Sequence, residues 1–114
     1  MRSFINIFKA LSDRNRVRIL KMLEIRPLCV CEITFILNIA TSTVSKHLSI
    51  LREAGFIVDE KDGKWVEYKL NANSDNPDVK QQLSLLPGWL NDDEVIKTYK
   101  TRVKEADRNI ICKT

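Results

Sequence analysis

Two cysteines, Cys29 and Cys31, stand one residue apart in the segment PLCVCEI, which covers residues 27–33. Thiolate sulfur is a soft ligand that selects soft metal and metalloid ions and disfavours magnesium and calcium. A thiol near a helix N-terminus has its thiolate form favoured, and the thiolate is the form that binds an ion. The pair therefore indicates an ion-binding site, although each cysteine alone could also be a small buried apolar side chain.

The spacing of the two cysteines restricts the backbone that can present them. In an α-helix, residues i and i+2 lie about 200° apart around the axis, so two helical sulfurs would point to opposite sides. In an extended chain they share a face, with Cα atoms about 6.7 Å apart. We expect ion binding to require a non-helical backbone from residue 29 to 31, at the start of a predicted helix 31–37. Ion binding would therefore conflict with helical geometry at Cys31. We infer that this conflict switches the protein between an ion-free and an ion-bound conformation.

Helical and strand patterns follow one another around the cysteines. Apolar residues at helical spacing predict helices over residues 4–11, 14–25, 31–37 and 41–54, and Gly55 is a typical helix stop. The period then changes to two, and Asp62-Gly63 lies between two β-rich runs, which predicts a hairpin over residues 56–70. We expect a brief helix at VKQQLSLL, broken by Pro87-Gly88, and one final helix over residues 92–113.

This order of elements predicts an α+β, mainly α, winged helix-turn-helix with a two-stranded wing. We expect one domain over residues 1–114, with the helix-turn-helix in 31–54 and the wing in 56–70. No apolar run reaches the roughly 18 residues of a membrane span, and the first residues lack the pattern of a signal peptide. We therefore expect a cytoplasmic protein with no membrane partner.

Positive charge is concentrated near the N-terminus. The net charge is +4, and residues 1–30 alone carry seven Lys or Arg against two Asp or Glu. A basic surface suits a polyanion, but the run DRNRVR could equally be a solvated helix face. Charge alone leaves both readings open.

The predicted helix 41–54 has the side chains of a DNA-reading helix. A helix fits the major groove, where small or cationic side chains reach base edges and phosphates. The candidate contacts from this helix and the wing are Thr41, Ser42, Thr43, Ser45, Lys46, His47, Arg52, Lys61 and Lys64. The alternatives are that the polar side chains are only the solvent-exposed face of the helix, that His47 is a packing residue, and that Arg52 pairs with a carboxylate. Acidic residues beside Lys61 and Lys64 oppose phosphate binding by the wing.

Four segments together resemble the ArsR/SmtB family of metal-responsive repressors. They are ALSDRNRVRILKML, LCVCEI, STVSKHLSILREAGFI and DGKWVEYKL. The resemblance implies a homodimer built through the first and last helices, here residues 1–25 and 78–113. It also implies an inverted-repeat DNA operator that is bound in the ion-free state and released when the ion binds. The positions matching Thr41, Ser42, Thr43, Ser45 and His47 lie on that family's recognition helix.

The identity of the ion depends on a third sulfur. Arsenic-sensing members of the family often place a cysteine three residues after the second, where this chain has Thr34. As(III) and Sb(III) prefer three sulfurs, so we expect Cys112, from the same chain or its dimer mate, to complete the site. The alternative is that Cys112 is an uninvolved terminal residue. Cd(II) or Pb(II) sensors of the family add cysteines from an N-terminal arm, and this N-terminus has none.

Three other functions compete with metalloid sensing. A redox or sulfide sensor of the same fold would pair Cys31 or Cys29 with Cys112. A cysteine enzyme would need a general base, and the single histidine, His47, stands on the predicted DNA face, so we expect no enzyme. A winged helix that binds only proteins would not show the salt dependence that phosphate contacts give.

Overall fold

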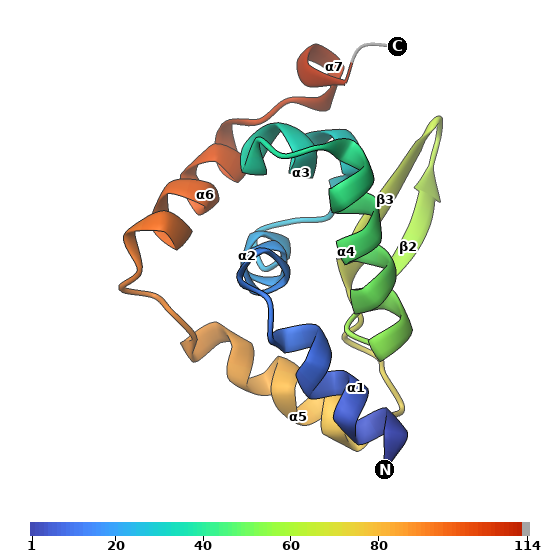
Figure 1. Ribbon diagram of the computed structural model, residues 1–114. Coiled ribbons are helices and arrows are strands. Elements are labelled where there is room, and N and C mark those ends of the chain that lie inside the picture. The colour runs from blue at the N-terminus through green and yellow to red at the C-terminus, as the bar shows by residue number, and fades with distance from the viewer. Residues whose placement is uncertain (113–114) are drawn as a thin grey trace.

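The computed structural model describes residues 1–112. Its elements in chain order are α1 (Arg2–Leu11), α2 (Arg14–Leu23), β1 (Leu28–Cys29), α3 (Val30–Leu37), α4 (Thr41–Ala54), β2 (Ile57–Asp62), β3 (Trp65–Leu70), α5 (Pro77–Leu85), the 3-10 turn η1 (Leu86–Gly88), α6 (Glu94–Glu105) and α7 (Arg108–Ile111). Helix α2 lies at the centre and contacts α1, α4, α6 and β3, as Figure 1 shows. Helices therefore cover the central helix on several sides.

Helix α2 is central because its sequence is apolar on the side that its neighbours cover. Ile19, Leu20 and Met22 are fully buried in the common core. The helix begins at Arg14 because the Asp13 carboxylate accepts the N–H groups of Asn15 and Arg16, at 2.8 Å and 3.1 Å. Such a cap satisfies N–H groups that have no partner inside the helix.

Helices α3 and α4 form the helix-turn-helix. Helix α3 ends at Asn38, whose left-handed backbone (φ 56°) turns the chain, and α4 begins after Ala40. Helix α4 ends at Gly55, which has a φ of 96° that side-chain-bearing residues rarely adopt. The predicted order of helix, turn and longer polar helix is confirmed, although α3 starts one residue earlier than expected.

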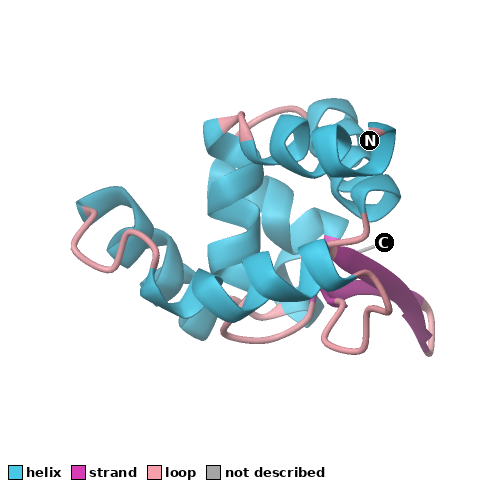
Figure 2. Ribbon diagram, turned by 90° about the horizontal axis from the view of Figure 1, so that it is seen from below, coloured by secondary structure: helices cyan, strands magenta, loops and turns pink. Residues whose placement is uncertain are grey.

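The wing is the antiparallel hairpin of β2 and β3, which projects from the helical body in Figure 2. Gly63 in its turn has a φ of 60°, as the Asp-Gly pattern predicts. The predicted two-stranded sheet is incomplete, because β1 adds a third strand in the order β1-β3-β2. Leu28 pairs with Tyr68 and Cys29 pairs with Glu67. The cysteine segment is thus hydrogen-bonded to the wing.

The predicted continuous final helix is wrong, because the chain leaves helical geometry at Ala106 and resumes as the short α7. The guanidinium of Arg26 donates to the carbonyls of Val103 and Ala106, at 3.1 Å and 2.9 Å, and so satisfies the free end of α6. Residue 113 of the predicted helix lies outside the described residues. Within residues 1–112, the helices are too short or too polar to span a membrane.

Candidate DNA-reading face and cysteine site

One face of α4 is polar and exposed while the other is buried. Val44, Leu48 and Leu51 are fully buried in the core and fix the helix against α1, α2 and α3. The exposed residues of the first turns are Thr41, Ser42, Thr43, Ser45 and Lys46. All five are among the predicted DNA contacts, and they form a continuous hydrogen-bonding surface at the start of α4.

His47 does not lie on that exposed surface, since it is only 8% exposed. Its Nδ1 atom is 3.2 Å from a guanidinium nitrogen of Arg16, and its Nε2 atom is 4.0 Å from the Asp13 carboxylate. This burial and these neighbours favour the packing alternative for His47 over a DNA contact. These polar partners lie at the start of α2.

Arg52 near the end of α4 and the two lysines near the hairpin turn, Lys61 and Lys64, are exposed, but two of these three side chains already have partners. A guanidinium nitrogen of Arg52 lies 3.4 Å from the Asp59 carboxylate, so in this structure Arg52 pairs with a carboxylate. The ammonium of Lys64 lies 4.9 Å from the centre of the Trp65 ring. Lys61 is exposed near the tip of the hairpin. Exposed ion pairs contribute little free energy, so Arg52 can exchange its partner for a phosphate at small cost.

Part of the N-terminal positive charge serves the fold. Arg16 donates to the carbonyls of Ala10 and Lys9, at 2.8 Å and 3.2 Å, and so caps the end of α1. The guanidinium of Arg18 lies 5.6 Å from the centre of the Tyr99 ring on α6. Arg16 and Arg18 of the run DRNRVR therefore have structural roles. Their contacts do not decide whether this segment also binds DNA.

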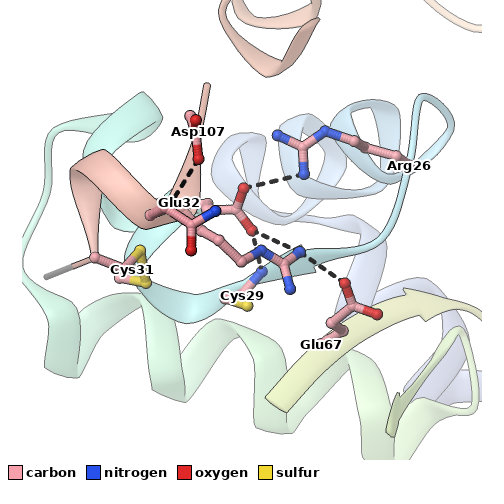
Figure 3. The surroundings of a disulfide bond; sticks show 9 residues. Arg26, Cys29, Cys31, Glu32, Glu67 and Asp107 are labelled. Atoms are coloured by element: carbon pink, nitrogen blue, oxygen red, sulfur yellow. Dashed lines mark hydrogen bonds and ion pairs between the residues drawn. A yellow bond between two sulfur atoms is a disulfide. The ribbon is translucent and has the colours of Figure 1, made fainter. Parts of the chain in front are cut away.

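The cysteine site is formed by Cys29, Cys31 and Cys112, and two of these residues are covalently joined. Cys31 and Cys112 form a disulfide across 81 residues, with Cα atoms 5.7 Å apart. Cys31 lies in the first turn of α3, and Cys29 precedes it in β1 with a φ of −83° and a ψ of 160°. Figure 3 shows Cys29 beside the disulfide. The expected non-helical backbone is therefore present at Cys29 but not at Cys31.

The thiol of Cys29 is buried and protonated. Burial raises its pKa to about 11, the nearby Arg108 guanidinium opposes this shift, and the Glu32 carboxylate adds to it. The expectation that the helix N-terminus favours the thiolate is wrong for Cys29 in this state, because removal from water outweighs the helix dipole.

A cleft of about 300 Å³ opens onto the cysteine site. It is lined by Cys29, Val30, Cys31, Thr41, Lys64, Trp65 and Val66. The cysteines and the wing thus share one surface with the first residue of α4. No group of three His, Cys, Asp or Glu side chains arranged to hold a metal ion occurs within residues 1–112. With Cys31 and Cys112 disulfide-bonded, their sulfurs are not available as thiolate ligands.

Sequence reasoning missed the charged residues that surround the cysteine site. Glu32 is fully buried and accepts the backbone N–H of Cys29 at 2.9 Å, while Arg26 lies 3.0 Å from its other oxygen. Arg108 lies 3.1 Å from Glu32 and 2.6 Å from Glu67 of β3. Figure 3 shows the pairing of Arg26 with Glu32. The available signal was the position of Glu32, three residues after the N-cap residue Cys29, where an acidic side chain typically accepts the backbone N–H of the N-cap residue.

A helix pair with an exposed polar second helix, followed by an antiparallel hairpin, defines a winged helix-turn-helix DNA-binding regulator. The family model "Bacterial regulatory protein, arsR family" matches residues 13–58, which include α2, α3 and α4. The chain belongs to this ArsR family, and it is a transcriptional repressor that binds double-stranded DNA.

Individual relatives agree with this assignment. The arsenical resistance operon repressor of Escherichia coli K12 is 33% identical over 109 residues, which are 93% of this chain and 83% of that protein. A cadmium resistance regulatory protein CadC homolog of Staphylococcus aureus is 42% identical over 76 residues, or 66% of this chain and 60% of that protein. Reduced HlyU from Vibrio cholerae N16961 superimposes with a TM-score of 0.64 at 29% identity, covering 79% of this chain and 90% of that one. The first two of these relatives are named as a repressor and a regulatory protein.

Proposed function

We propose that this repressor controls metal(loid)-resistance genes and leaves its operator when As(III) or Sb(III) binds the thiolates of Cys29, Cys31 and Cys112. Cd(II) or Pb(II) is the alternative inducer. The first relative named above is an arsenical resistance repressor and the second a cadmium resistance regulator, which supports both classes of ion. Reduction of the disulfide must come first, because a metalloid binds thiolates.

The observation that carries the proposal is that Cys112 lies within bonding distance of Cys31 in the same chain. A third sulfur therefore reaches Cys31 of the CxC pair without a partner subunit, although Thr34 stands where arsenic-sensing members of the family often have a cysteine. The site also includes the first turn of α3, which packs on α4. Binding that unwinds this turn would displace the DNA-reading helix.

The oligomer belongs to the proposal as well. The apolar side chains of Phe4, Ile5 and Phe8 are each 43% exposed along α1, and Val95 on α6 is 40% exposed. A second copy covering these faces would bury them and place two α4 helices against an inverted repeat. We propose residues 1–25 and 78–113 as the dimerisation segments and residues 31–54 and 56–70 as the DNA-binding segments.

The proposal is tested with a duplex selected from a random pool by the reduced protein. Its dissociation constant is measured in rising salt and then in rising arsenite, antimonite, cadmium or lead. We expect affinity to fall with salt, because phosphate contacts release counterions. We expect arsenite to weaken binding of the wild type by about 5–150-fold, the usual range of allosteric coupling.

Serine variants identify the ligands. Cys29→Ser and Cys31→Ser should each abolish release by arsenite while keeping the affinity for the free duplex. Cys112→Ser should shift release to higher arsenite, and an unchanged arsenite response in this variant would remove Cys112 from the site. If the double variant Cys29→Ser, Cys31→Ser still releases the duplex with arsenite, the metalloid proposal fails.

The disulfide supports a second candidate, in which the repressor responds to oxidants or sulfide through Cys31 and Cys112. Peroxide would take two electrons and two protons from these thiols, which forms the S–S bond and two molecules of water. Cys29 has no part in this step, so Cys29→Ser separates the two functions. Release of the wild type by peroxide or polysulfide but not by arsenite would favour the redox sensor, and Cys29→Ser should then respond to peroxide as the wild type does.

A further inference from the structure

Arg108 contacts three separate parts of the fold with one guanidinium group. Its Nη2 atom lies 3.1 Å from Glu32 on α3 and 2.6 Å from Glu67 on β3. Its Nη1 atom lies 3.8 Å from Asp62 at the end of β2. A planar guanidinium can hold several carboxylates at once, which an ammonium group does poorly. Arg108 thus links the supporting helix of the helix-turn-helix to both strands of the wing.

Loss of Arg108 would destabilise the pairing of the two wing strands at Glu67. Glu67 stands directly opposite Glu60 in the β2–β3 ladder, and like charges at such a position destabilise the pairing. Glu60 has its own cation, Lys69, whereas the ion pair of Glu67 within residues 1–112 is with Arg108. Loss of Arg108 therefore leaves a half-buried negative charge at the junction of the wing with β1.

The position of Arg108 depends on the cysteine site. Helix α7 has four residues, and a helix of that length does not persist on its own. It is held by Arg108 at its first residue and by Cys112, bonded to Cys31, immediately after its last. An atom bound between three sulfurs, or a pair of separated thiols, would place Cys112 differently and move α7 with it.

We propose that Arg108 is the positioning residue that carries the state of the cysteine site to the wing. The inference rests on the proposed function, because it concerns how a change at the sulfurs alters DNA affinity. With Cys112 bonded to Cys31, Arg108 holds Glu32 and Glu67 together and fixes the wing against α3. When Cys112 is displaced, the two carboxylates lose their shared cation and the wing changes its angle to α4.

The experiment measures the dissociation constant of the selected duplex for the full chain in three states: reduced, reduced with arsenite, and oxidised with diamide. Diamide takes two electrons and two protons from the thiols of Cys31 and Cys112, and its N=N bond becomes a hydrazine. We expect the wild type to change affinity by about 5–150-fold between the reduced state and at least one other. In Arg108→Gln that ratio should fall below about threefold.

Two further variants make the result independent of folding defects. Glu67→Gln removes the wing end of the link and leaves Glu32 with Arg26 and Arg108, and it should lose the ratio as Arg108→Gln does. Lys104→Gln removes an equal charge from an exposed position on α6 and should keep the wild-type ratio. A purely structural role would alter stability in the variants but leave the ratio between states unchanged.

The outcomes separate this inference from the function beneath it. A wild type whose affinity is the same in all three states contradicts the proposed function and leaves Arg108 with no signal to carry. A responsive wild type with an equally responsive Glu67→Gln overturns the inference alone. If Arg108→Gln does not fold, Glu67→Gln and Lys104→Gln decide the question between them.

Discussion

The three cysteines differ in chemistry because their surroundings differ. Cys31 is partly exposed at the first turn of α3 and bonded to Cys112, whereas Cys29 is 3% exposed in β1. A buried thiol with a raised pKa is a poor nucleophile at neutral pH. Cys29 therefore takes no part in disulfide exchange while the bond is closed, and it must become a thiolate before it can bind a metalloid.

The protection of Cys29 leads to a prediction about its reactivity. In the oxidised protein we expect iodoacetamide to modify Cys29 at a negligible rate at pH 7 and appreciably only as the pH approaches the pKa of about 11. Because the folded pKa lies above the unfolded one, the protonated thiol favours folding below the unfolded value, and this contribution is lost between that value and pH 11. Mass spectrometry of the alkylated chain measures the rate, and the urea-unfolded chain is the control. Rapid alkylation at pH 7 would contradict the assignment.

The sequence predicted the exposed residues of α4 but left open whether His47 is a DNA contact or a packed side chain. Thr41, Ser42, Thr43, Ser45 and Lys46 follow from helical periodicity within one segment. The partners of His47 are Arg16 and Asp13, about thirty residues earlier, and no local pattern reveals them. The charged residues around the cysteines can likewise be read from the sequence. Which of them contact one another depends on the tertiary structure, which no local pattern predicts.

At the scale of elements, local signals succeeded and long-range pairing was missed. The wing and α4 were predicted from Asp62-Gly63 and from Gly55, whose conformational preferences act within a few residues. Strand β1 has two residues and exists because β3, nearly forty residues later, pairs with it. The end of α6 depends on Arg26, which lies 77 to 80 residues earlier in the chain. Such contacts override helix propensity.

Gly55 gives the clearest prediction for a single element. Its φ of 96° strains any L side chain, and an added Cβ would lie 3.3 Å from Cγ2 of Val79 on the adjoining α5. We expect Gly55→Ala to lower the free energy of unfolding by more than about 1 kcal/mol. Gly88→Ala is the matched control, because Gly88 has no left-handed φ and open space around it. Urea unfolding of both variants under reducing conditions measures the difference, and equal midpoints would contradict the expected strain.

At the scale of the whole molecule, the disulfide closes a loop that contains both α4 and the wing. Its sequence separation of 81 residues corresponds to about 4–5 kcal/mol in the chain-entropy estimate for cross-links. We expect the reductant TCEP to lower the free energy of unfolding of the wild type by up to this amount, measured in urea at fixed protein concentration. Cys112→Ser should unfold identically with and without TCEP. A wild type that is indifferent to TCEP would show that the bond adds nothing to stability.

The pairing of β1 with β3 has a consequence for engineering. Cys29 and Glu67 are ladder partners, so the proposed sensing site and the proposed DNA-binding wing share one hydrogen-bonded sheet. In a chimera whose hairpin comes from a relative, Cys29 would pair with a different residue of β3. Inducer threshold and promoter choice will therefore change together in such biosensors, and a designer cannot exchange them as independent modules.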